Sequence, residues 1–253
     1  MSTLVVFGLV LYVIASSPGW PRVQSTFFSF SKFLETQPKI FAGFLVNLGI
    51  FLVAQALVLI FALLLAVMRS LKDPVFFPFR AFAIVYIDLF RGLPSILIIY
   101  VLGLGIPALR IPGLTSDVYV WGVVALVLVW TAYVAEVYRS GIDSVHPSQD
   151  AAARSLGLSG FQAFRFVVLP QAVRRVIPPL LNDASGLMKD TALVSFLGPV
   201  ESFRRSQIFA SADFNYTPYL VSAMLFLLLT IPLARLVDWL VARDRKRYLA
   251  GAR

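Results

Sequence analysis

The chain has 253 residues, of which 59% are hydrophobic and 14% are charged, and its formal net charge is +9. So much apolar surface exceeds what one soluble core of this length needs, and this composition favours a membrane protein. The sequence has no cysteine and one histidine, His146, so we expect no disulfide, no metal site and no catalytic residue. The positive side chains lie at the ends of apolar runs, where membrane topology accounts for them, so we expect no nucleic-acid binding.

Residues 1–39 are predicted to be an N-terminal hydrophobic segment followed by an extracytoplasmic stretch. The apolar run from Leu4 to Ala15 is short for a bilayer span, which takes about 20 residues, and no charged side chain occurs before Arg22. Because this run lacks the positively charged start of a secretory signal, we expect a retained extra helix, and a cleaved signal segment is the alternative. Residues 16–39 are too short for a soluble domain and are predicted to be surface outside the cytoplasm.

Residues 40–253 are predicted to form one membrane domain. Long uncharged runs indicate helical spans, because about 20 helical residues cross a bilayer. These runs are Ile40–Met68, Gly92–Leu109 at the end of a helix drawn from Ala81, Val118–Ala135 and Phe214–Ala234.

The segment from Phe166 to Val200 is also predicted to cross the membrane, but it differs from the other spans. Charged residues interrupt it, and Pro178-Pro179 predicts a kink or a helix break. A helix facing lipid would not tolerate so many charged side chains, so this helix should line a protein interior or an aqueous path. The expected fold is all-α, a polytopic transmembrane helical bundle of five core helices plus the extra N-terminal helix.

The distribution of Lys and Arg predicts the orientation. Three regions are rich in them: the loop with Arg69, Lys72 and Arg80, the polar stretch 139–165, and the tail from Arg243 onward. Because cytoplasmic loops carry an excess of Lys and Arg, all three regions should face the cytoplasm. The chain is therefore expected to be a multi-pass membrane protein with a cytoplasmic C-terminus.

Two pairs of opposite charges lie three residues apart on predicted helices. Asp88 and Arg91 are interpreted as a local structural pair, with a gating role as the alternative. Glu136 and Arg139 stand at the entrance to the polar stretch and predict a simple intrahelical pair. The alternative for Glu136 is that it anchors the helix of the polar stretch.

The polar stretch 139–165 carries the signals of a short helix. His146-Pro147-Ser148 is typical of a helix start, and Gly157 permits a left-handed backbone where the helix ends. Phe161 and Phe164 follow, three residues apart, and should present one apolar edge. A short helix with small residues and exposed aromatics suits the groove of a partner protein, and an amphipathic loop on the bilayer surface is the alternative.

Four strings of the sequence resemble one family. In the first, Ala151-Ala152-Ala153 is followed by three residues, Gly157, nine residues, Val167, one residue and Leu169-Pro170. The others are Phe90-Arg91-Gly92-Leu93-Pro94, the run from Ala132 to Ile142 and the run from Leu187 to Leu193. Together they resemble the permease subunits of bacterial polar amino-acid ABC importers, of the histidine, glutamine and arginine type. The resemblance extends from about Asn47 to the C-terminus.

The chain departs from the family pattern in two places. The pattern starts with Glu-Ala-Ala and has Ile before the Leu-Pro, whereas this chain has Ala151 and Val167 there. Asp150 precedes Ala151, but one residue turns a helix by about 100°, so we do not assign Asp150 the role of the missing Glu. The resemblance implies that loop 139–165 couples to an ATPase. Within it, the coupling residues are Ala151, Ala152, Ala153, Arg154, Leu156, Gly157, Phe161 and Phe164.

The resemblance also implies a type I ABC importer permease fold and a set of partners. These are two copies of an ABC ATPase subunit, a second permease subunit (the same chain or a homologue), and an extracytoplasmic amino-acid-binding protein, in the lipid bilayer of the bacterial cytoplasmic membrane. The sequence has no GxxxxGK phosphate-binding loop. We therefore expect no enzyme activity and no cofactor in this chain, with ATP and Mg in the partner ATPase. A self-contained secondary transporter or channel for small polar solutes is the alternative.

The expected substrate path lies on the segment that carries the charges. Asp183 and Asp190 are seven residues, or two turns, apart and share nearly one face, with Gly186 and Leu187 between them. Such carboxylates would meet the ammonium group of an amino acid, and Lys189 would meet its carboxylate. The alternative, that Lys189 and Asp190 pair with other protein charges and hold helices in register, remains open. The acidic groups favour a basic amino acid slightly.

Overall fold

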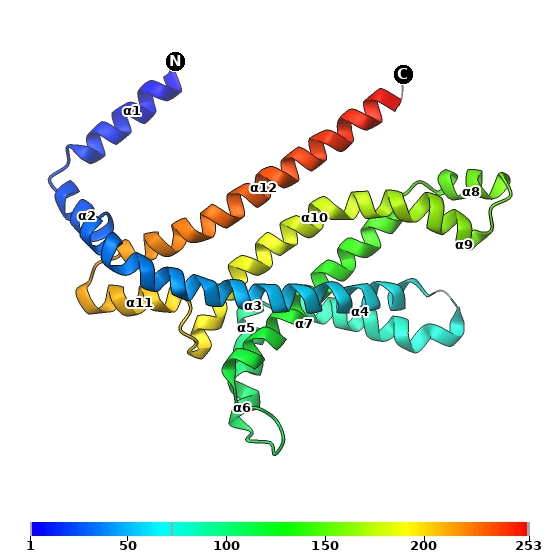
Figure 1. Cartoon of the computed structure of the whole chain (residues 1–253), viewed down its shortest axis with the longest axis horizontal. Helices are drawn as coiled ribbons and strands as arrows, with labels where there is room; N and C mark the ends of the chain where they lie inside the picture. The colour runs from blue at the N-terminus through cyan, green and yellow to red at the C-terminus, as the bar shows by residue number, and fades with distance from the viewer. Residues whose placement is uncertain (1, 72, 252–253) are drawn as a thin grey trace. The chain divides into compact units, whose positions relative to one another are not determined.

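A computed structural model of the chain describes residues 2–71 and 73–251. Within these ranges, it describes the backbone but not the side chains of residues 2–4, 10, 11 and 244–251. Every regular element in these ranges is a helix (Figure 1). The all-α prediction is therefore confirmed. The helices group into two compact units, Met1–Val46 with Val200–Leu227 and Asn47–Pro199 with Leu228–Arg253.

The first unit holds the N-terminal helices and the segment before the last helix. Its elements are α1 (Ser2–Ala15), α2 (Trp20–Phe27), the first part of α3 (Phe30–Ser70), α11 (Ser202–Asp213) and the first part of α12 (Thr217–Gly251). The predicted surface stretch 16–39 is thus mostly helical, and α3 runs through the expected boundary at residue 39 without a break.

Tertiary contacts explain why α2 is ordered. Tyr216 N donates a hydrogen bond to Thr26 O at 2.7 Å, and Asn215 Nδ2 donates to Ser25 O at 2.8 Å. The rings of Phe27 and Tyr216 stack with their centroids 5.3 Å apart. These contacts involve residues far apart in the sequence, so local composition alone did not reveal the helix.

α11 begins where it packs closely on α3. A Cβ atom on Gly43 would come within 2.7 Å of Ser202 N, so only glycine allows this approach. Glu201 is fully buried and caps α11, because its carboxylate accepts hydrogen bonds from Phe203 N at 2.8 Å and Arg204 N at 2.7 Å. A carboxylate at a helix N-terminus satisfies unpaired N–H groups and interacts favourably with the helix dipole.

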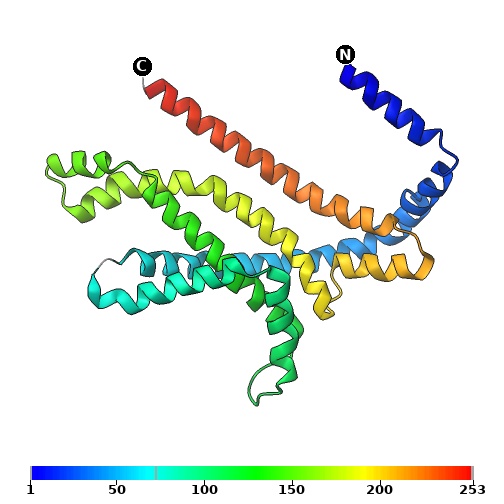
Figure 2. The ribbon, with the colours of Figure 1, turned by 180° about the vertical axis from the view of Figure 1, so that it is seen from behind.

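The second unit contains the remaining helices. They are the rest of α3, η1 (Pro74–Phe76), α4 (Phe77–Gly92), α5 (Ser95–Tyr100), η2 (Val101–Gly105), α6 (Ile106–Ala108), α7 (Val118–Asp143), α8 (Pro147–Ser155), α9 (Gly160–Ala163), η3 (Phe164–Val168), α10 (Leu169–Asp190), η4 (Thr191–Leu197) and the end of α12. Helix α7 is central in this unit, because α4 and α10 both pack along it (Figure 2).

Glycines bring α7 and α10 close together. A Cβ atom on Gly141 of α7 would overlap the side chain of Val176, and one on Gly186 of α10 would overlap the ring of Trp130. Small residues at such positions let helix backbones approach closely, which is a common way for membrane helices to pack. We call this contact the α7–α10 seam.

The helix drawn from Ala81 to Leu109 is wrong as a single element. α4 ends at Gly92, Leu93 is extended with ψ 142°, and α5 begins after Pro94. The segments Pro74–Gly92 and Ser95–Ala108 are bent by 103° relative to each other. The cause is Pro94, which has no backbone N–H and disfavours the helical conformation of the residue before it.

Of the kink or helix break predicted at Pro178-Pro179, the break is wrong, because both prolines lie inside α10. Buried residues flank them, Ala172 and Val176 before and Leu187 and Met188 after. Since α10 packs along α7, the seam offsets the backbone hydrogen bonds that the prolines remove.

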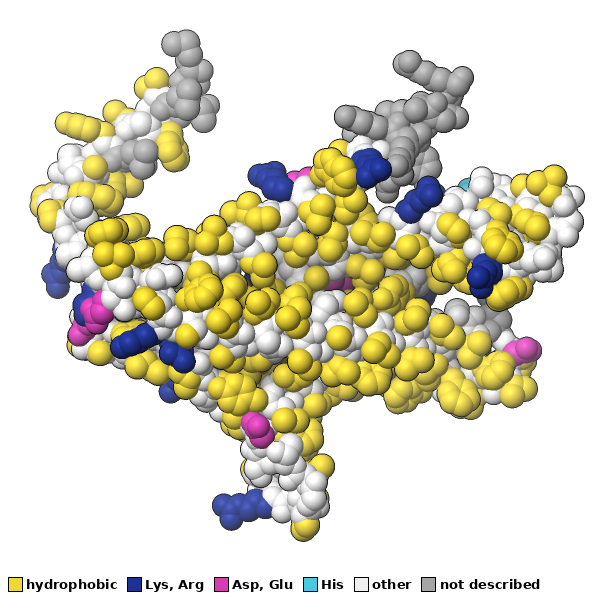
Figure 3. Space-filling model, viewed as in Figure 1, with side chains coloured by type: hydrophobic (Ala, Val, Ile, Leu, Met, Phe, Trp, Pro, Cys, Tyr) yellow, Lys and Arg dark blue, Asp and Glu magenta, His cyan; other side chains and the backbone are white. Residues whose placement is uncertain are grey.

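Several helices can cross a membrane by length and composition. Within the described residues they are Trp20–Ser70, Val118–Asp143 and Thr217–Arg243, with the bent pair Pro74–Gly92 and Ser95–Ala108 as a fourth span. With the more polar α10, they supply the five expected core helices, and α1 is the additional N-terminal helix. Hydrophobic side chains cover much of the visible surface (Figure 3). Lys72 and Arg253, which supported the predicted orientation, lie outside the described residues.

Candidate functional site

The loop between α7 and α10 has the structure that its sequence signals predict. His146 caps α8, with its Nδ1 accepting from Ser148 N at 3.2 Å, and Pro147 occupies the first turn. The chain leaves α8 through Gly157, whose φ of +89° lies in the left-handed region. Ser159 then starts α9 with a reciprocal capping box. The predicted helix and the left-handed glycine are confirmed.

The surface of this loop is apolar at several points. Leu156 is 84% exposed, Phe161 70% and Phe164 38%. Ala151 and Ala152 are exposed too, whereas Ala153 is buried. Exposed large apolar side chains on a short polar loop mark a surface that a partner or a membrane covers.

Asp150 is engaged within its own helix. Its carboxylate forms an ion pair with Arg154 at 2.9 Å. The Asp150 carboxylate therefore already has a partner on α8 and is not assigned the role of the missing Glu.

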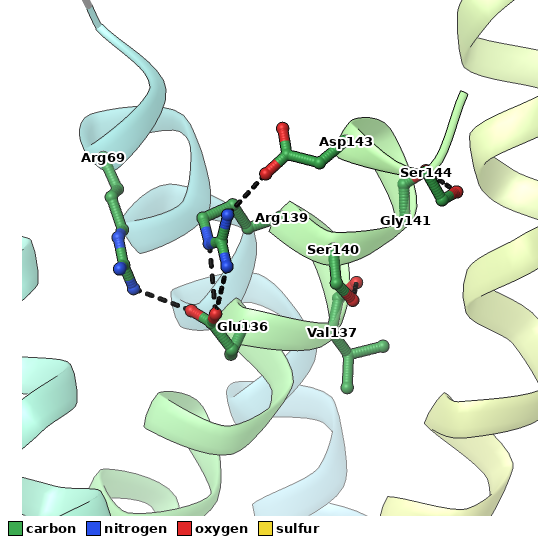
Figure 4. A network of polar contacts seen from close by, with 8 residues as sticks. All are labelled: Arg69, Glu136, Val137, Arg139, Ser140, Gly141, Asp143 and Ser144. Atoms are coloured by element: carbon green, nitrogen blue, oxygen red, sulfur yellow. Dashed lines mark hydrogen bonds and ion pairs between the residues drawn. The ribbon is translucent and has the colours of Figure 1, made fainter. Parts of the chain in front are cut away.

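A charge network joins α3 and α7 at the start of the loop (Figure 4). Arg69 Nη1 contacts Glu136 Oε2 at 2.7 Å, and Arg139 donates from Nε to Glu136 Oε1 at 3.1 Å. Arg139 also pairs with Asp143. The predicted Glu136–Arg139 pair is thus confirmed, and the structure adds a cross-helix partner, Arg69, that the sequence did not reveal.

The network lies close to a contact between the loop and α10. The Arg175 guanidinium donates a hydrogen bond to Ser144 O. Ser144 follows the last residue of α7, so α10 holds the chain at the point where the loop begins. The contacts of Glu136 and Ser144 together tie the beginning of the loop to two other helices.

The local pair of Asp88 and Arg91 does not form. Both side chains are exposed and described, and no ion pair joins them. The Arg91 guanidinium instead lies over the ring of Tyr133 at 5.5 Å. A cation over an aromatic face is a favourable alternative, and it connects α4 to α7.

The carboxylates of α10 face the neighbouring helices. Asp183 is half-buried, and its Oδ2 atom is buried without a hydrogen-bond partner. The Arg91 guanidinium is near enough to interact with this carboxylate electrostatically. Asp190 Oδ2 accepts a hydrogen bond from Trp130 Nε1 at 3.2 Å. Trp130 was missed, although a tryptophan inside an apolar span could have drawn attention to it.

The other residues of the expected path differ in exposure. Lys189 is exposed, whereas Leu187 is 1% exposed and Gly186 is packed against Trp130. Gly186 therefore belongs to the α7–α10 seam, and Leu187 next to it is buried. In the described part of the chain, no cluster of His, Asp and Glu side chains has the arrangement of a metal site.

Comparisons with known proteins agree with this architecture. The family described as "Binding-protein-dependent transport system inner membrane component" matches residues 74–246. The putative glutamine transport system permease protein GlnP of Rickettsia conorii is 33% identical over 206 residues, covering 80% of this chain and 92% of that protein. The probable glutamine ABC transporter permease protein GlnM of Bacillus subtilis is 32% identical over 228 residues, covering 90% of this chain and 100% of that protein.

Two solved structures are similar as well. The crystal structure of an amino acid ABC transporter with histidines superposes with a TM-score of 0.77 at 29% identity, covering 85% of this chain and 98% of that chain. The MetNI methionine ABC transporter in inward-facing conformations superposes with a TM-score of 0.59 at 20% identity, covering 81% and 93%, and this second likeness concerns the fold alone.

Proposed function

Because the chain belongs to the family of binding-protein-dependent transport system inner membrane components, we propose that it forms the membrane pathway of an ATP-driven importer for a polar amino acid. Its relatives are named as glutamine and amino-acid permeases. The observation that carries the proposal is the exposed α8–Gly157–α9 loop within the matched region. Such a loop gives a membrane subunit a rigid contact for a driving partner.

The loop 139–165 is the proposed docking surface for a separate ATPase. Leu156 and Phe161 are exposed, and large apolar side chains supply much of the contact energy at protein interfaces. The sequence has no phosphate-binding loop, so ATP and Mg belong in the ATPase. The full assembly would contain two ATPase copies, a second permease and an external binding protein, with the loop and C-terminus in the cytoplasm.

The proposed substrate path runs past Asp183 and Asp190. Asp183 is half-buried, and one oxygen of its carboxylate accepts no hydrogen bond; an ammonium group would pair with this carboxylate. A charged side chain in a membrane helix is costly and is usually functional. Asp190 already accepts from Trp130, so it is the weaker candidate for direct contact. Two carboxylates favour a cationic amino acid such as arginine, lysine, ornithine or histidine.

Reconstitution in liposomes tests this proposal. The chain is combined with a candidate ATPase and binding protein, and ATP hydrolysis is measured with a panel of amino acids. We expect stimulation by a polar amino acid and a loss of this stimulation in Asp183→Asn. Asp88→Asn, which changes an exposed carboxylate on another helix, is the matched control.

Three outcomes would contradict the proposal in different ways. The absence of stimulation by every amino acid would contradict the substrate class. Equal effects of Asp183→Asn and Asp88→Asn would contradict the path. Amino-acid uptake by the purified chain alone, driven by an ion gradient, would instead indicate a self-contained secondary transporter or channel.

A further inference from the structure

Arg91 is a cation within a membrane span that is not in direct contact with a carboxylate. It is the last residue but one of α4, next to the bend that divides the fourth span. Its side chain is exposed, and its guanidinium lies over the Tyr133 ring at 5.5 Å. Among the described residues, it forms no hydrogen bond and no ion pair. Ionisable groups inside membrane spans are costly and mark substrate paths, so Arg91 is available to bind an anion.

Two carboxylates lie near enough to Arg91 to interact with it electrostatically. The first, Glu136, is already in contact with Arg69 at 2.7 Å and with Arg139 at 3.1 Å. The second, Asp183 of α10, is half-buried, and one of its oxygens accepts no hydrogen bond. Arg91 and Asp183 are thus opposite charges on two helices that lie close to each other but are not joined by an ion pair.

Aromatic rings on α7 connect Arg91 to the second carboxylate of the proposed path. The Tyr133 ring, next to the Arg91 guanidinium, has its centroid 5.5 Å from that of the Trp130 ring. Trp130 Nε1 donates a hydrogen bond to Asp190 Oδ2 at 3.2 Å. Arg91, Asp183 and Asp190 therefore belong to one group of neighbouring side chains from α4, α7 and α10, all within the second unit.

An amino acid zwitterion carries the pair of charges that complements Arg91 and Asp183. Its ammonium and carboxylate groups are bonded to the same carbon atom, so the two side chains that bind them have to lie close together without neutralising each other. Arg91 and Asp183 meet this requirement. The planar guanidinium can also donate two parallel hydrogen bonds to one carboxylate.

Lys189, which the sequence suggested as the partner of the substrate carboxylate, is placed less well. It interacts electrostatically with Asp190, which already accepts a hydrogen bond from Trp130. A lysine ammonium is also a point charge without the bidentate geometry of arginine. Arg91, by contrast, lies near Asp183, the stronger candidate for contact with an ammonium group.

We propose that Arg91 binds the α-carboxylate of the transported amino acid while Asp183 binds its ammonium group. This inference rests on the proposed function and adds a specificity-determining residue to it. The pathway selects molecules that carry both charged groups over amines that have the same side chain but lack the carboxylate.

Binding to the full chain, without ATPase and binding protein, tests the inference. Isothermal titration calorimetry of the chain in lipid nanodiscs measures the dissociation constants of two matched pairs, L-arginine with agmatine and L-glutamine with 4-aminobutanamide. The second compound of each pair lacks only the carboxylate. We expect at least one amino acid to bind about tenfold more tightly than its decarboxylated partner, which cannot accept the charge-assisted hydrogen bonds of Arg91.

The ratio of the two dissociation constants separates a carboxylate contact from a structural role of Arg91. Arg91→Gln should remove the tenfold preference by weakening the amino acid alone, and Arg91→Lys should keep part of it. Loss of the contact with Tyr133 would weaken both compounds equally. Retained binding of the amine shows that the variant is folded. Arg235→Gln, the control, removes the same charge from a 79% exposed side chain on α12 and should leave the ratio unchanged.

Each contrary result overturns the inference. No binding of either amino acid, or equal affinities within both pairs, would show that this group of side chains does not recognise a carboxylate. An unchanged ratio in Arg91→Gln would exclude Arg91, and loss of the ratio in Lys189→Gln alone would assign the carboxylate to Lys189. The proposed function fails separately, if no amino acid stimulates ATP hydrolysis in the complete reconstituted transporter.

Discussion

The loop from α8 to α9 and the α7–α10 seam are close in sequence but are stabilised in different ways. In the loop, His146 and Ser159 cap the helices that follow them, and Gly157 allows the turn between them. In the seam, Gly186 is required by Trp130 on another helix. We therefore expect the seam to govern folding of the chain and the exposed surface of the loop to govern assembly with a partner.

The largest loss of stability is expected from a substitution at Gly186 in the α7–α10 seam. We expect Gly186→Val to destabilise the purified chain by about 1–3 kcal/mol, because the added side chain overlaps the Trp130 ring. Thermal unfolding in detergent measures this. Gly49→Ala is the control, since a Cβ at that position meets no atom within 4 Å. A melting temperature of Gly186→Val equal to that of Gly49→Ala would show that the seam is not closely packed.

Substitutions at Gly157 should affect the loop according to how readily the new residue adopts the left-handed backbone conformation. We expect Gly157→Val to cost about 1–2 kcal/mol, because its φ of +89° disfavours L-residues. Gly157→Asn should be milder, since asparagine adopts the left-handed region more readily. Stimulated ATP hydrolysis in the reconstituted complex and melting of the isolated chain are both measured. If Gly157→Asn reduces ATP hydrolysis more than Gly157→Val does, the left-handed conformation at this position cannot explain the effect.

The charge network connects the two regions, and its contribution should be smaller. We expect a coupling energy of about 0.5–1 kcal/mol between Arg69 and Glu136, whose side chains are 25% and 22% exposed. A double-mutant cycle with Arg69→Gln and Glu136→Gln measures it. The Arg235–Asp238 pair is 79% and 68% exposed and should show almost no coupling. Similar values for the two pairs would contradict a structural role for Glu136.

The smallest effect on the isolated chain is expected at Phe161. Because its side chain is 70% exposed, Phe161→Ala should change stability by less than about 0.5 kcal/mol. Copurification of the ATPase should nevertheless fall sharply. Val75→Ala, at an 81% exposed position in η1, should keep the ATPase bound. If the Phe161→Ala variant retains the ATPase, the proposal that this part of the loop surface docks the ATPase is contradicted.

Local signals allowed the loop to be predicted in detail. Proline in the first turn of α8, the left-handed Gly157 and the following helix start act over a few residues. Long apolar runs similarly indicated α3, α7 and α12. The break before α5 was missed because the apolar run through Leu109 outweighed Pro94, although that proline was visible in the sequence.

Other features depend on residues from different helices. Pro178-Pro179 predicted a kink or a break, yet α10 continues through both prolines, with buried residues on either side. The helical stretch around α2 depends on Asn215 and Tyr216, which come much later in the chain. The partners of Glu136 and Asp190 on neighbouring helices, Arg69 and Trp130, have no local sequence signal.

The membrane class, the all-α fold, the family resemblance and the form of the loop could be predicted from the sequence, because hydropathy, motif spacing, capping and glycine conformation act over short stretches of chain. The close packing at Gly186 and the cross-helix network at Glu136 became evident in the three-dimensional structure alone. These features depend on which side chains meet across helices, and packing in three dimensions sets that choice.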